Sequence, residues 1–190
     1  MSEIVLFHHA LGLTPGVTAL ADRFRAVGHA VHTPDLYGGR TFPVLEEGVA
    51  YARSVGMQAL IDAGVAAAAR LPADSVLMGI SLGIGPATKA AIDRPAARAV
   101  VQVAGAGDPG WWDATWPEGT ALQIHGARDD PWWQEDAEAA QMLAASVAGS
   151  QLFLYDGSAH LFMDNSTPEY DAVQTDRLVG RVLDLLSRVG

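Results

Sequence analysis

The chain contains no cysteine, few basic residues and no long apolar run, and each absence excludes a class of protein. Without cysteine, its 190 residues can form no disulfide, no thiolate metal site and no cysteine nucleophile. No segment approaches the run of about 18 apolar residues that a transmembrane helix needs. Residues 1–7 combine an acidic residue with a short apolar run, which is unlike a signal peptide. We therefore expect a cytoplasmic protein that does not bind membranes.

The charge balance also restricts the partners. Twenty-two acidic residues against twelve basic ones give a formal net charge of −10. This surplus repels the phosphates of nucleic acids and anionic lipids, and no basic stripe offsets it. We expect a small molecule as the partner, and a monomer or a small homo-oligomer.

The order of apolar patterns predicts an α/β fold. The length favours one domain over residues 1–190. Short apolar runs alternate with segments of helical spacing, which is typical of βαβ units. The predicted strands are 4–8, 30–34, 75–80, 97–104, 121–125 and 151–155. The predicted helices are 17–27, 57–71, 82–92, 135–146 and 171–189. The pattern thus indicates a doubly wound, mostly parallel sheet of about six strands, with residues 38–55 as a long surface connection.

A serine between two glycines lies at one predicted strand-to-helix junction, in the sequence Gly79-Ile80-Ser81-Leu82-Gly83. A sharp turn there strains the backbone and exposes the Ser81 hydroxyl above the sheet. The free N–H of Leu82 at the start of the next helix can stabilise a negatively charged oxygen. So short a motif can arise by chance, but its position favours a nucleophile.

An aspartate and a histidine follow in chain order. Asp129 and Asp130 come after the predicted strand 121–125, and His160 lies in a loop of small residues after the last strand. A histidine in such a loop can accept the serine proton. It could also be a surface histidine without a task. Asp130 precedes Pro131, which favours an extended backbone at Asp130, so we prefer Asp130 as the acid. Asp129 remains an alternative for this role.

The five tryptophans lie in loops that follow predicted strands, and two further histidines lie at the end of the first strand. The tryptophans fall in two predicted loops, as Trp111, Trp112 and Trp116 and as Trp132 and Trp133. Both loops should open on the carboxyl edge of the sheet, where ligands of such folds bind. The rings either line a pocket beside Ser81 or anchor the loops. His8 and His9 point to opposite faces of a strand end and cannot chelate one metal together, so we predict no metal site.

In combination these segments resemble the dienelactone hydrolases of the α/β-hydrolase fold, over nearly the whole chain. The matching segments are His8-His9-Ala10-Leu11-Gly12, Pro34-Asp35-Leu36-Tyr37, the Ser81 motif, His125 with Asp130 five residues later, and Ser158-Ala159-His160. The resemblance implies an α/β-hydrolase fold. Because the chain is short, we expect a minimal fold without a cap domain, and hydrolysis by these residues needs no cofactor. It implies Ser81 as nucleophile, His160 as base and Asp130 as its partner. The backbone N–H groups of Ala10 and Leu82 would form the oxyanion hole.

Three departures from that family shift the expected substrate. Serine replaces the family's cysteine nucleophile at position 81. A glutamate held near the resting nucleophile corresponds to His9, and an arginine that grips the substrate carboxylate corresponds to Asp164. An anionic dienelactone would meet repulsion from Asp164, so we expect an uncharged carboxylic ester or lactone instead. The residues expected to line its pocket are His9, Trp112, Trp132 and Phe162.

Two alternatives to an esterase remain at this point. The same three residues could cleave a thioester. The chain could also be a catalytically idle member of the fold that binds a small ligand or a protein, because a fold alone does not guarantee activity.

Overall fold

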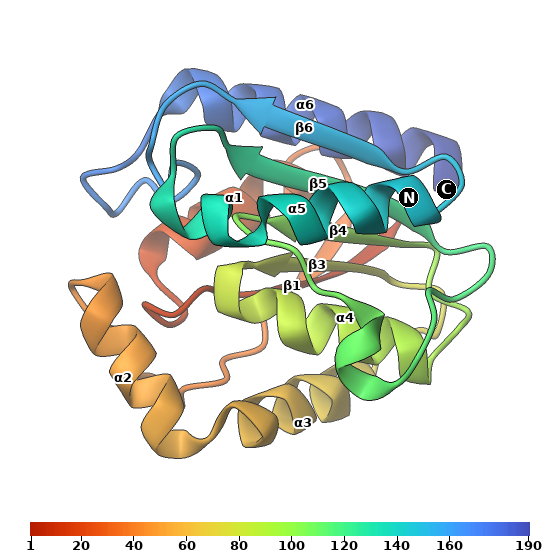
Figure 1. Cartoon of the computed structure of the whole chain (residues 1–190), viewed down its shortest axis with the longest axis horizontal. Coiled ribbons are helices and arrows are strands. Elements are labelled where there is room, and N and C mark those ends of the chain that lie inside the picture. Colours follow the sequence, from red (N-terminus) through yellow and green to blue (C-terminus); the bar gives the residue numbers. More distant parts are fainter.

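A computed structural model describes residues 1–190 and contains a sheet of six strands, all of them parallel (Figure 1). The strands are β1 (Glu3–Phe7), β2 (Ala30–His32), β3 (Val76–Ile80), β4 (Ala99–Val103), β5 (Ala121–Ala127) and β6 (Gln151–Tyr155). Their spatial order is β2-β1-β3-β4-β5-β6. The chain therefore reverses its direction of winding between β1 and β3. In open α/β sheets the ligand crevice forms outside the carboxyl ends of the strands at this switch point.

Six α-helices flank the sheet on both faces. They are α1 (Pro15–Arg25), α2 (Leu45–Val55), α3 (Met57–Ala68), α4 (Ile84–Asp93), α5 (Pro131–Ser146) and α6 (Ala172–Val189). Helices α1 and α6 pack on one face, and α3, α4 and α5 pack on the other. This confirms the doubly wound α/β architecture expected from the sequence. None of the helices combines the length and the apolar character that crossing a bilayer would require.

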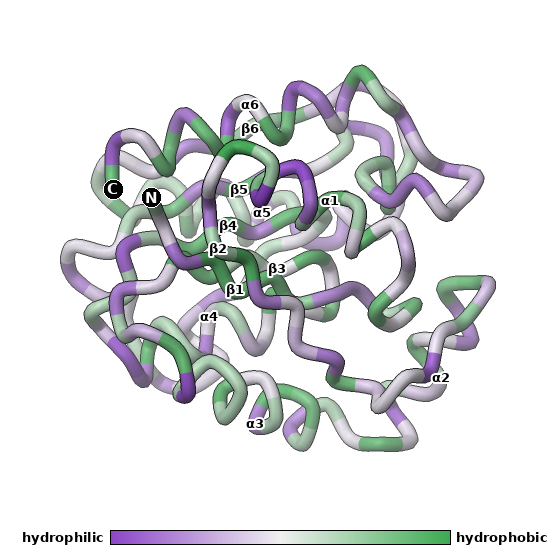
Figure 2. The backbone as a smooth tube through the Cα atoms, turned by 180° about the vertical axis from the view of Figure 1, so that it is seen from behind, coloured by the Kyte–Doolittle hydropathy of each residue, from purple (hydrophilic) through white to green (hydrophobic).

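Strand alternation divides the core between the two faces. In β1, Ile4 and Leu6 belong to the cluster under α1 and α6, whereas Val5 and Phe7 pack toward α3 and α4. Strands buried on both faces are apolar at nearly every position, which is why the predicted strands appeared as continuous runs. Figure 2 shows hydrophobic residues concentrated in the central strands. Helix α6 contributes the apolar stripe predicted for it, because Leu178, Val182, Leu185 and Leu186 are all buried.

The prediction of a surface connection over residues 38–55 was wrong for its second half, which forms α2. The fully buried residues of this helix are the small Gly48 and Ala52, while the larger Leu45 and Tyr51 are only partly buried. The prediction missed this helix because it looked for a stripe of large buried residues. A Cβ on Gly48 would lie 2.0 Å from the carbonyl oxygen of Ala10. Helix α2 thus packs closely through small residues against the loop that follows β1.

Helix α5 begins four residues earlier than predicted. Pro131 occupies its first turn, and the Asp130 side chain accepts a hydrogen bond from the Trp132 N–H at 3.0 Å. An aspartate cap followed by proline is a favourable helix start. Trp132 and Trp133 therefore lie in the first turn of a helix and not in a loop.

Candidate active site

Ser81 follows β3 directly and begins a short 3-10 helix, Ser81–Gly83, that leads into α4. Its φ of 49° lies in the left-handed region, which is strained for a residue with a side chain. The flanking glycines are required by close packing: a Cβ on Gly79 would lie 2.3 Å from the Gly83 carbonyl oxygen, and one on Gly83 would lie 2.4 Å from that of Phe7. The turn leaves the Ser81 side chain partly exposed at the carboxyl edge of the sheet.

The structure brings Ser81, His160 and Asp130 together from three separate loops. The Ser81 Oγ lies 3.0 Å from His160 Nε2, and His160 Nδ1 lies 2.7 Å from Asp130 Oδ2. Because a carboxylate only accepts, Nδ1 carries the proton and Nε2 accepts from the serine hydroxyl. His160 and Asp130 are buried, whereas Asp129 is exposed. The arrangement can deprotonate Ser81 and stabilise the resulting imidazolium.

Two cavities meet at His160 and Trp132, which line both of them. One, of about 210 Å³, contains Ser81, and its other residues come from α3, α4, the loop after β4 and the start of α5. The second, of about 360 Å³, lies toward α2 and the loop before α6. The Trp132 and His160 ring centroids are 6.0 Å apart. The candidate nucleophile thus opens into a small compartment with an aromatic wall.

Some tryptophans line the cavity beside Ser81, and others anchor their segments to the core. Trp132 lines the cavity beside Ser81, and Trp111, 61% exposed, lines it in place of the expected Trp112. Trp133 is buried in the core, where a Cβ on Gly126 would lie 2.1 Å from its ring, and the partly buried Trp116 packs against the core from outside. Two rings therefore form the pocket wall and two anchor their segments.

The expectation that His9 and Phe162 line the pocket is not met, because both are buried and neither lines these cavities. Phe162 packs against Tyr155, with ring centroids 4.8 Å apart. His9 Nε2 lies 2.7 Å from Asp164 Oδ2. Asp164 is also buried and lines neither cavity, so the expectation that it faces the substrate is not met.

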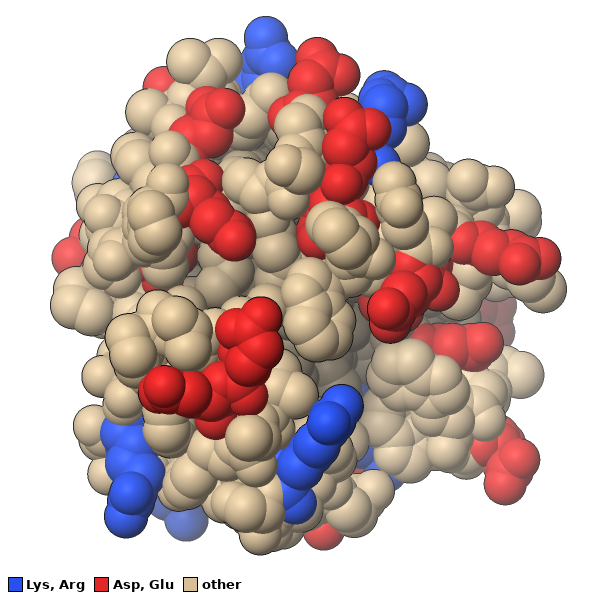
Figure 3. Space-filling view, turned by 60° about the vertical axis from the view of Figure 1, so that its left-hand side comes forward, with Lys and Arg blue, Asp and Glu red and all other residues tan.

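Other carboxylates lie at the mouth of the site. Figure 3 brings the carboxyl ends of the strands forward and shows Asp and Glu side chains gathered around a hollow. Glu135 and Asp136 line the cavity with Ser81, and Glu46 and Glu169 line the second one. No lysine or arginine lines either cavity. Burial raises the pKa of Asp136, whose carboxylate accepts the Ala106 N–H at 3.2 Å.

The sequence could have revealed one of these residues. Trp132 and Asp136 are four positions apart in α5, so their side chains share one face of the helix. The late prediction of the helix start, at residue 135, concealed this spacing. Trp111 had no such signal, because it lies in a short 3-10 helix, Pro109–Trp112, whose position depends on the path of the chain after β4.

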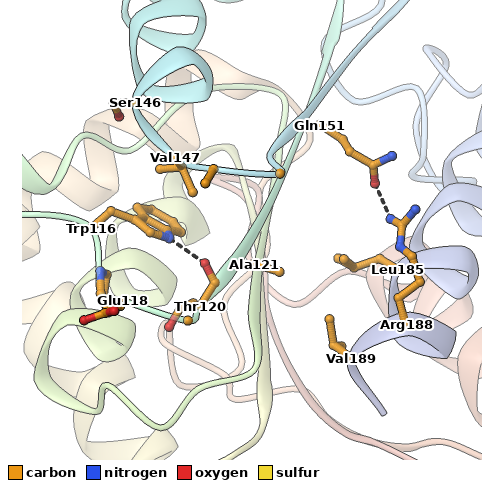
Figure 4. A pocket seen from close by; sticks show the side chains of 14 residues that line it. Trp116, Glu118, Thr120, Ala121, Ser146, Val147, Gln151, Leu185, Arg188 and Val189 are labelled. Carbon is orange, nitrogen blue, oxygen red and sulfur yellow. Dashed lines mark hydrogen bonds between the residues drawn. The ribbon is translucent and has the colours of Figure 1, made fainter.

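A larger cavity, of about 760 Å³, lies at the opposite edge of the sheet (Figure 4). It opens at the amino ends of β5 and β6 and beside the end of α6. Trp116 Nε1 donates to the Thr120 carbonyl, and Arg188 donates to Gln151. Its lining includes Glu118 but no histidine, and none of the three candidate residues Ser81, Asp130 and His160 reaches it.

Comparison with solved structures shows proteins that share this fold. A dienelactone hydrolase-like promiscuous phosphotriesterase from metagenomic libraries has a TM-score of 0.76 at 21% identity, covering 100% of this chain and 87% of the other. A dienelactone hydrolase from Anabaena variabilis has a TM-score of 0.65 at 18% identity, covering 96% and 83%. The mouse alpha/beta hydrolase domain-containing protein 10 has a TM-score of 0.70 at 13% identity, covering 100% and 90%.

Sequence comparison gives the family. No curated protein sequence matches the chain significantly. The model of the dienelactone hydrolase family matches residues 1–190, the full length of the chain. The order of Ser81, Asp130 and His160 and their loops agree with the resemblance seen in the sequence. The chain therefore belongs to the dienelactone hydrolase family.

Proposed function

We propose that this protein is a serine hydrolase that cleaves small, uncharged carboxylic esters or lactones through an acyl-enzyme. The observation that carries the proposal is the continuous chain of hydrogen bonds from Ser81 through His160 to Asp130, at 3.0 and 2.7 Å. A serine hydroxyl is a weak nucleophile alone, and an oriented imidazole removes its proton as it attacks.

The reaction runs in two halves on these three residues. Ser81 Oγ attacks the ester carbonyl carbon while its proton passes to His160 Nε2. The carbon–oxygen bond to the alcohol then breaks, and His160 returns the proton to the leaving oxygen. A water molecule attacks the acyl-enzyme with His160 again as base, which releases the acid and restores Ser81. Asp130 holds the imidazole orientation throughout.

Two backbone N–H groups are proposed to stabilise the oxyanion, those of Ala10 and Leu82. Leu82 follows Ser81 in the 3-10 helix, and Ala10 lies in the loop after β1, the neighbouring strand at the switch point. The loops are in close contact, since a Cβ on Gly83 would lie 2.7 Å from the His8 carbonyl oxygen. The Ala10 N–H has no acceptor within the protein, which supports its assignment as a donor to substrate.

The cavity supports the substrate class. Its volume of about 210 Å³ is below the usual range for drug-sized ligands, which favours a short acyl or aryl group. Trp111 and Trp132 offer apolar contact, while Glu135 and Asp136 disfavour a substrate carboxylate.

A substrate panel tests the proposal. Wild type and Ser81→Ala are compared on a neutral aryl ester, its carboxylate-bearing analogue and an acyl thioester. We expect turnover of the neutral ester, and a loss approaching ~10⁶-fold in the variant. An unchanged urea midpoint would show that Ser81→Ala is folded. A variant that keeps more than a tenth of wild-type turnover would refute Ser81, and preference for the thioester would make the protein a thioesterase.

A further inference from the structure

We propose that a second buried histidine–aspartate pair, His9 and Asp164, is a positioning device that aims the Ala10 N–H at the oxyanion. The inference rests on the proposed function. It concerns residues that do not touch the substrate and assigns them a role in the rate of the reaction.

The hydrogen bonds of His9 fix its tautomer. Its Nδ1 accepts the Leu11 N–H at 3.2 Å, so the ring proton lies on Nε2. Nε2 then donates to Asp164 Oδ2 at 2.7 Å, and both side chains are buried. The ring of His9 thus connects the backbone of the loop after β1 to a carboxylate 155 positions away.

Asp164 is itself held rigidly. Thr14 Oγ1 donates to Oδ2 at 2.5 Å, and the N–H and hydroxyl of Ser166 donate to Oδ1 at 2.8 and 2.6 Å. A Cβ on Gly16 would lie only 1.6 Å from Oδ1, so the carboxylate occupies space that only glycine leaves free. Burial alone would raise the pKa of Asp164, but the hydrogen bonds from His9, Ser166 and Thr14 lower it to about 2. The carboxylate is therefore ionised at neutral pH.

The peptide group between His9 and Ala10 is fixed from the other side. The His9 carbonyl accepts hydrogen bonds from the Gly12 N–H at 3.0 Å and from His8 Nδ1 at 2.8 Å. His8 Nε2 in turn accepts the Leu36 N–H at 3.0 Å. Because a trans peptide is planar, fixing this carbonyl also fixes the direction of the Ala10 N–H on its opposite side.

These contacts connect two parts of the proposed mechanism. Asp164 lies four residues beyond His160, and His9 lies one residue before Ala10. The pair thus sets the distance between the segment that carries the base and the loop that carries the oxyanion donor. Displacements of about 1 Å in such donors can change rates by about a hundredfold. Asp164 occupies the position where the family comparison expected an arginine for substrate, and the structure gives it an internal partner instead.

The test compares His9→Gln and Asp164→Asn with a matched control, Ser166→Ala. The control removes one hydrogen bond from the same carboxylate, on the side away from His9. For a neutral aryl ester, we expect kcat to fall roughly 10–100-fold in His9→Gln and Asp164→Asn, below the full loss of an oxyanion donor. KM should stay within about twofold, because the pair does not line the cavity. Ser166→Ala should keep kcat within about twofold.

A transition-state analogue provides a readout that a purely structural role would not change. An aryl boronic acid forms a tetrahedral adduct with an activated serine, so its affinity should fall by the same factor as kcat/KM. If the pair acts as one unit, the double variant should be no less active than the more impaired of the two single variants. Urea unfolding of each variant reports stability separately.

Several results would overturn the inference. An unchanged kcat in His9→Gln and Asp164→Asn would show that the pair only stabilises the fold, and so would an equal loss of kcat in Ser166→Ala. Neither result would refute Ser81 as the nucleophile. A wild type that neither turns over esters nor binds the boronic acid would refute the proposed function and the inference together. If the variants do not fold, amide hydrogen exchange in wild type decides: the Leu11 amide should be protected, and fast exchange would contradict the inference.

Discussion

The two carboxylate oxygens of Asp130 have different partners: one lies beside the His160 ring, and the other accepts a backbone N–H at the start of α5. Oδ2 lies 2.7 Å from His160 Nδ1, while Oδ1 accepts the Trp132 N–H at 3.0 Å and caps α5. One side chain thus orients the imidazole and begins the helix that supplies Trp132 and Asp136 to the cavity. The position of the acid and the shape of the pocket are set by the same turn.

This relationship predicts unequal effects of substitution at the two adjacent aspartates. Asp130→Asn should lower turnover by about 10⁴-fold, because an amide favours the wrong imidazole tautomer. The helix cap should survive, since asparagine caps as well as aspartate does. Asp129→Asn should have little effect, because Asp129 is exposed. Steady-state kinetics of the two variants distinguish them, and the reverse order would assign the acid to Asp129.

A second prediction concerns substrate charge. Two carboxylates about 6 Å apart repel by roughly 3 kcal/mol at an effective dielectric constant near 20. We expect kcat/KM for a neutral ester to exceed that of its carboxylate-bearing analogue by at least about 10-fold at low salt, with a smaller ratio at high salt. Glu135→Gln should reduce the ratio because Glu135 lines the cavity with Ser81.

Glu118→Gln is the matched control for this prediction, because Glu118 lines the distant cavity at the amino edge of the sheet. It removes the same charge and should leave the ratio unchanged. Equal effects of the two substitutions would mean that net charge, and not the local carboxylate, discriminates. A preference for the acid at low salt would return dienelactone-like substrates to consideration.

A third prediction separates the two roles of the tryptophans. Trp111→Ala should raise KM for an aryl ester several-fold and change stability little, because the ring is 61% exposed and lines the cavity. Trp116→Ala should lower the free energy of unfolding by about 2 kcal/mol or more and leave KM unchanged, since this ring packs on the core. Kinetics and urea unfolding of both variants check this. A higher KM in Trp116→Ala alone would reverse the assignment.

A fourth prediction concerns the glycine before Ser81. Gly79→Ala should destabilise the fold and abolish activity, because its Cβ would meet the Gly83 backbone at 2.3 Å. Gly180→Ala is the control: Gly180 lies within α6, where an added Cβ meets nothing within 4 Å. Alanine there should stabilise the protein by about 0.5–1 kcal/mol. Thermal or urea unfolding gives both values, and a fully active Gly79→Ala would contradict the tight turn described for Ser81.

The sheet and the order of the three candidate residues could be predicted from the sequence because their signals are local. The four central strands are buried on both faces and appear as apolar runs. The glycines at 79 and 83 mark the turn at Ser81. Helix α2 was missed because its fully buried residues are the small Gly48 and Ala52, and its larger apolar residues Leu45 and Tyr51 are only partly buried. Its contact with the Ala10 carbonyl is a long-range feature.

The surroundings of the site were harder to predict than its order. Asp164 was expected to face the substrate, yet it is paired with His9, which lies 155 positions earlier in the chain. Nothing within either segment indicates this pairing. The sequence predicted Trp112 in the cavity, but Trp111 lies there. The cause is similar, since one residue of rotation in a short 3-10 helix decides which ring faces the cavity.

The most direct test of the account is covalent labelling of wild-type protein with a fluorophosphonate, followed by digestion and mass spectrometry. Only an activated serine reacts, so we predict one label per chain, on the peptide that contains Ser81. Ser81→Ala should take up none, and His160→Ala should react far more slowly because the base is missing. An unlabelled wild type, or a label on another residue, would contradict the assignment of Ser81 as the nucleophile.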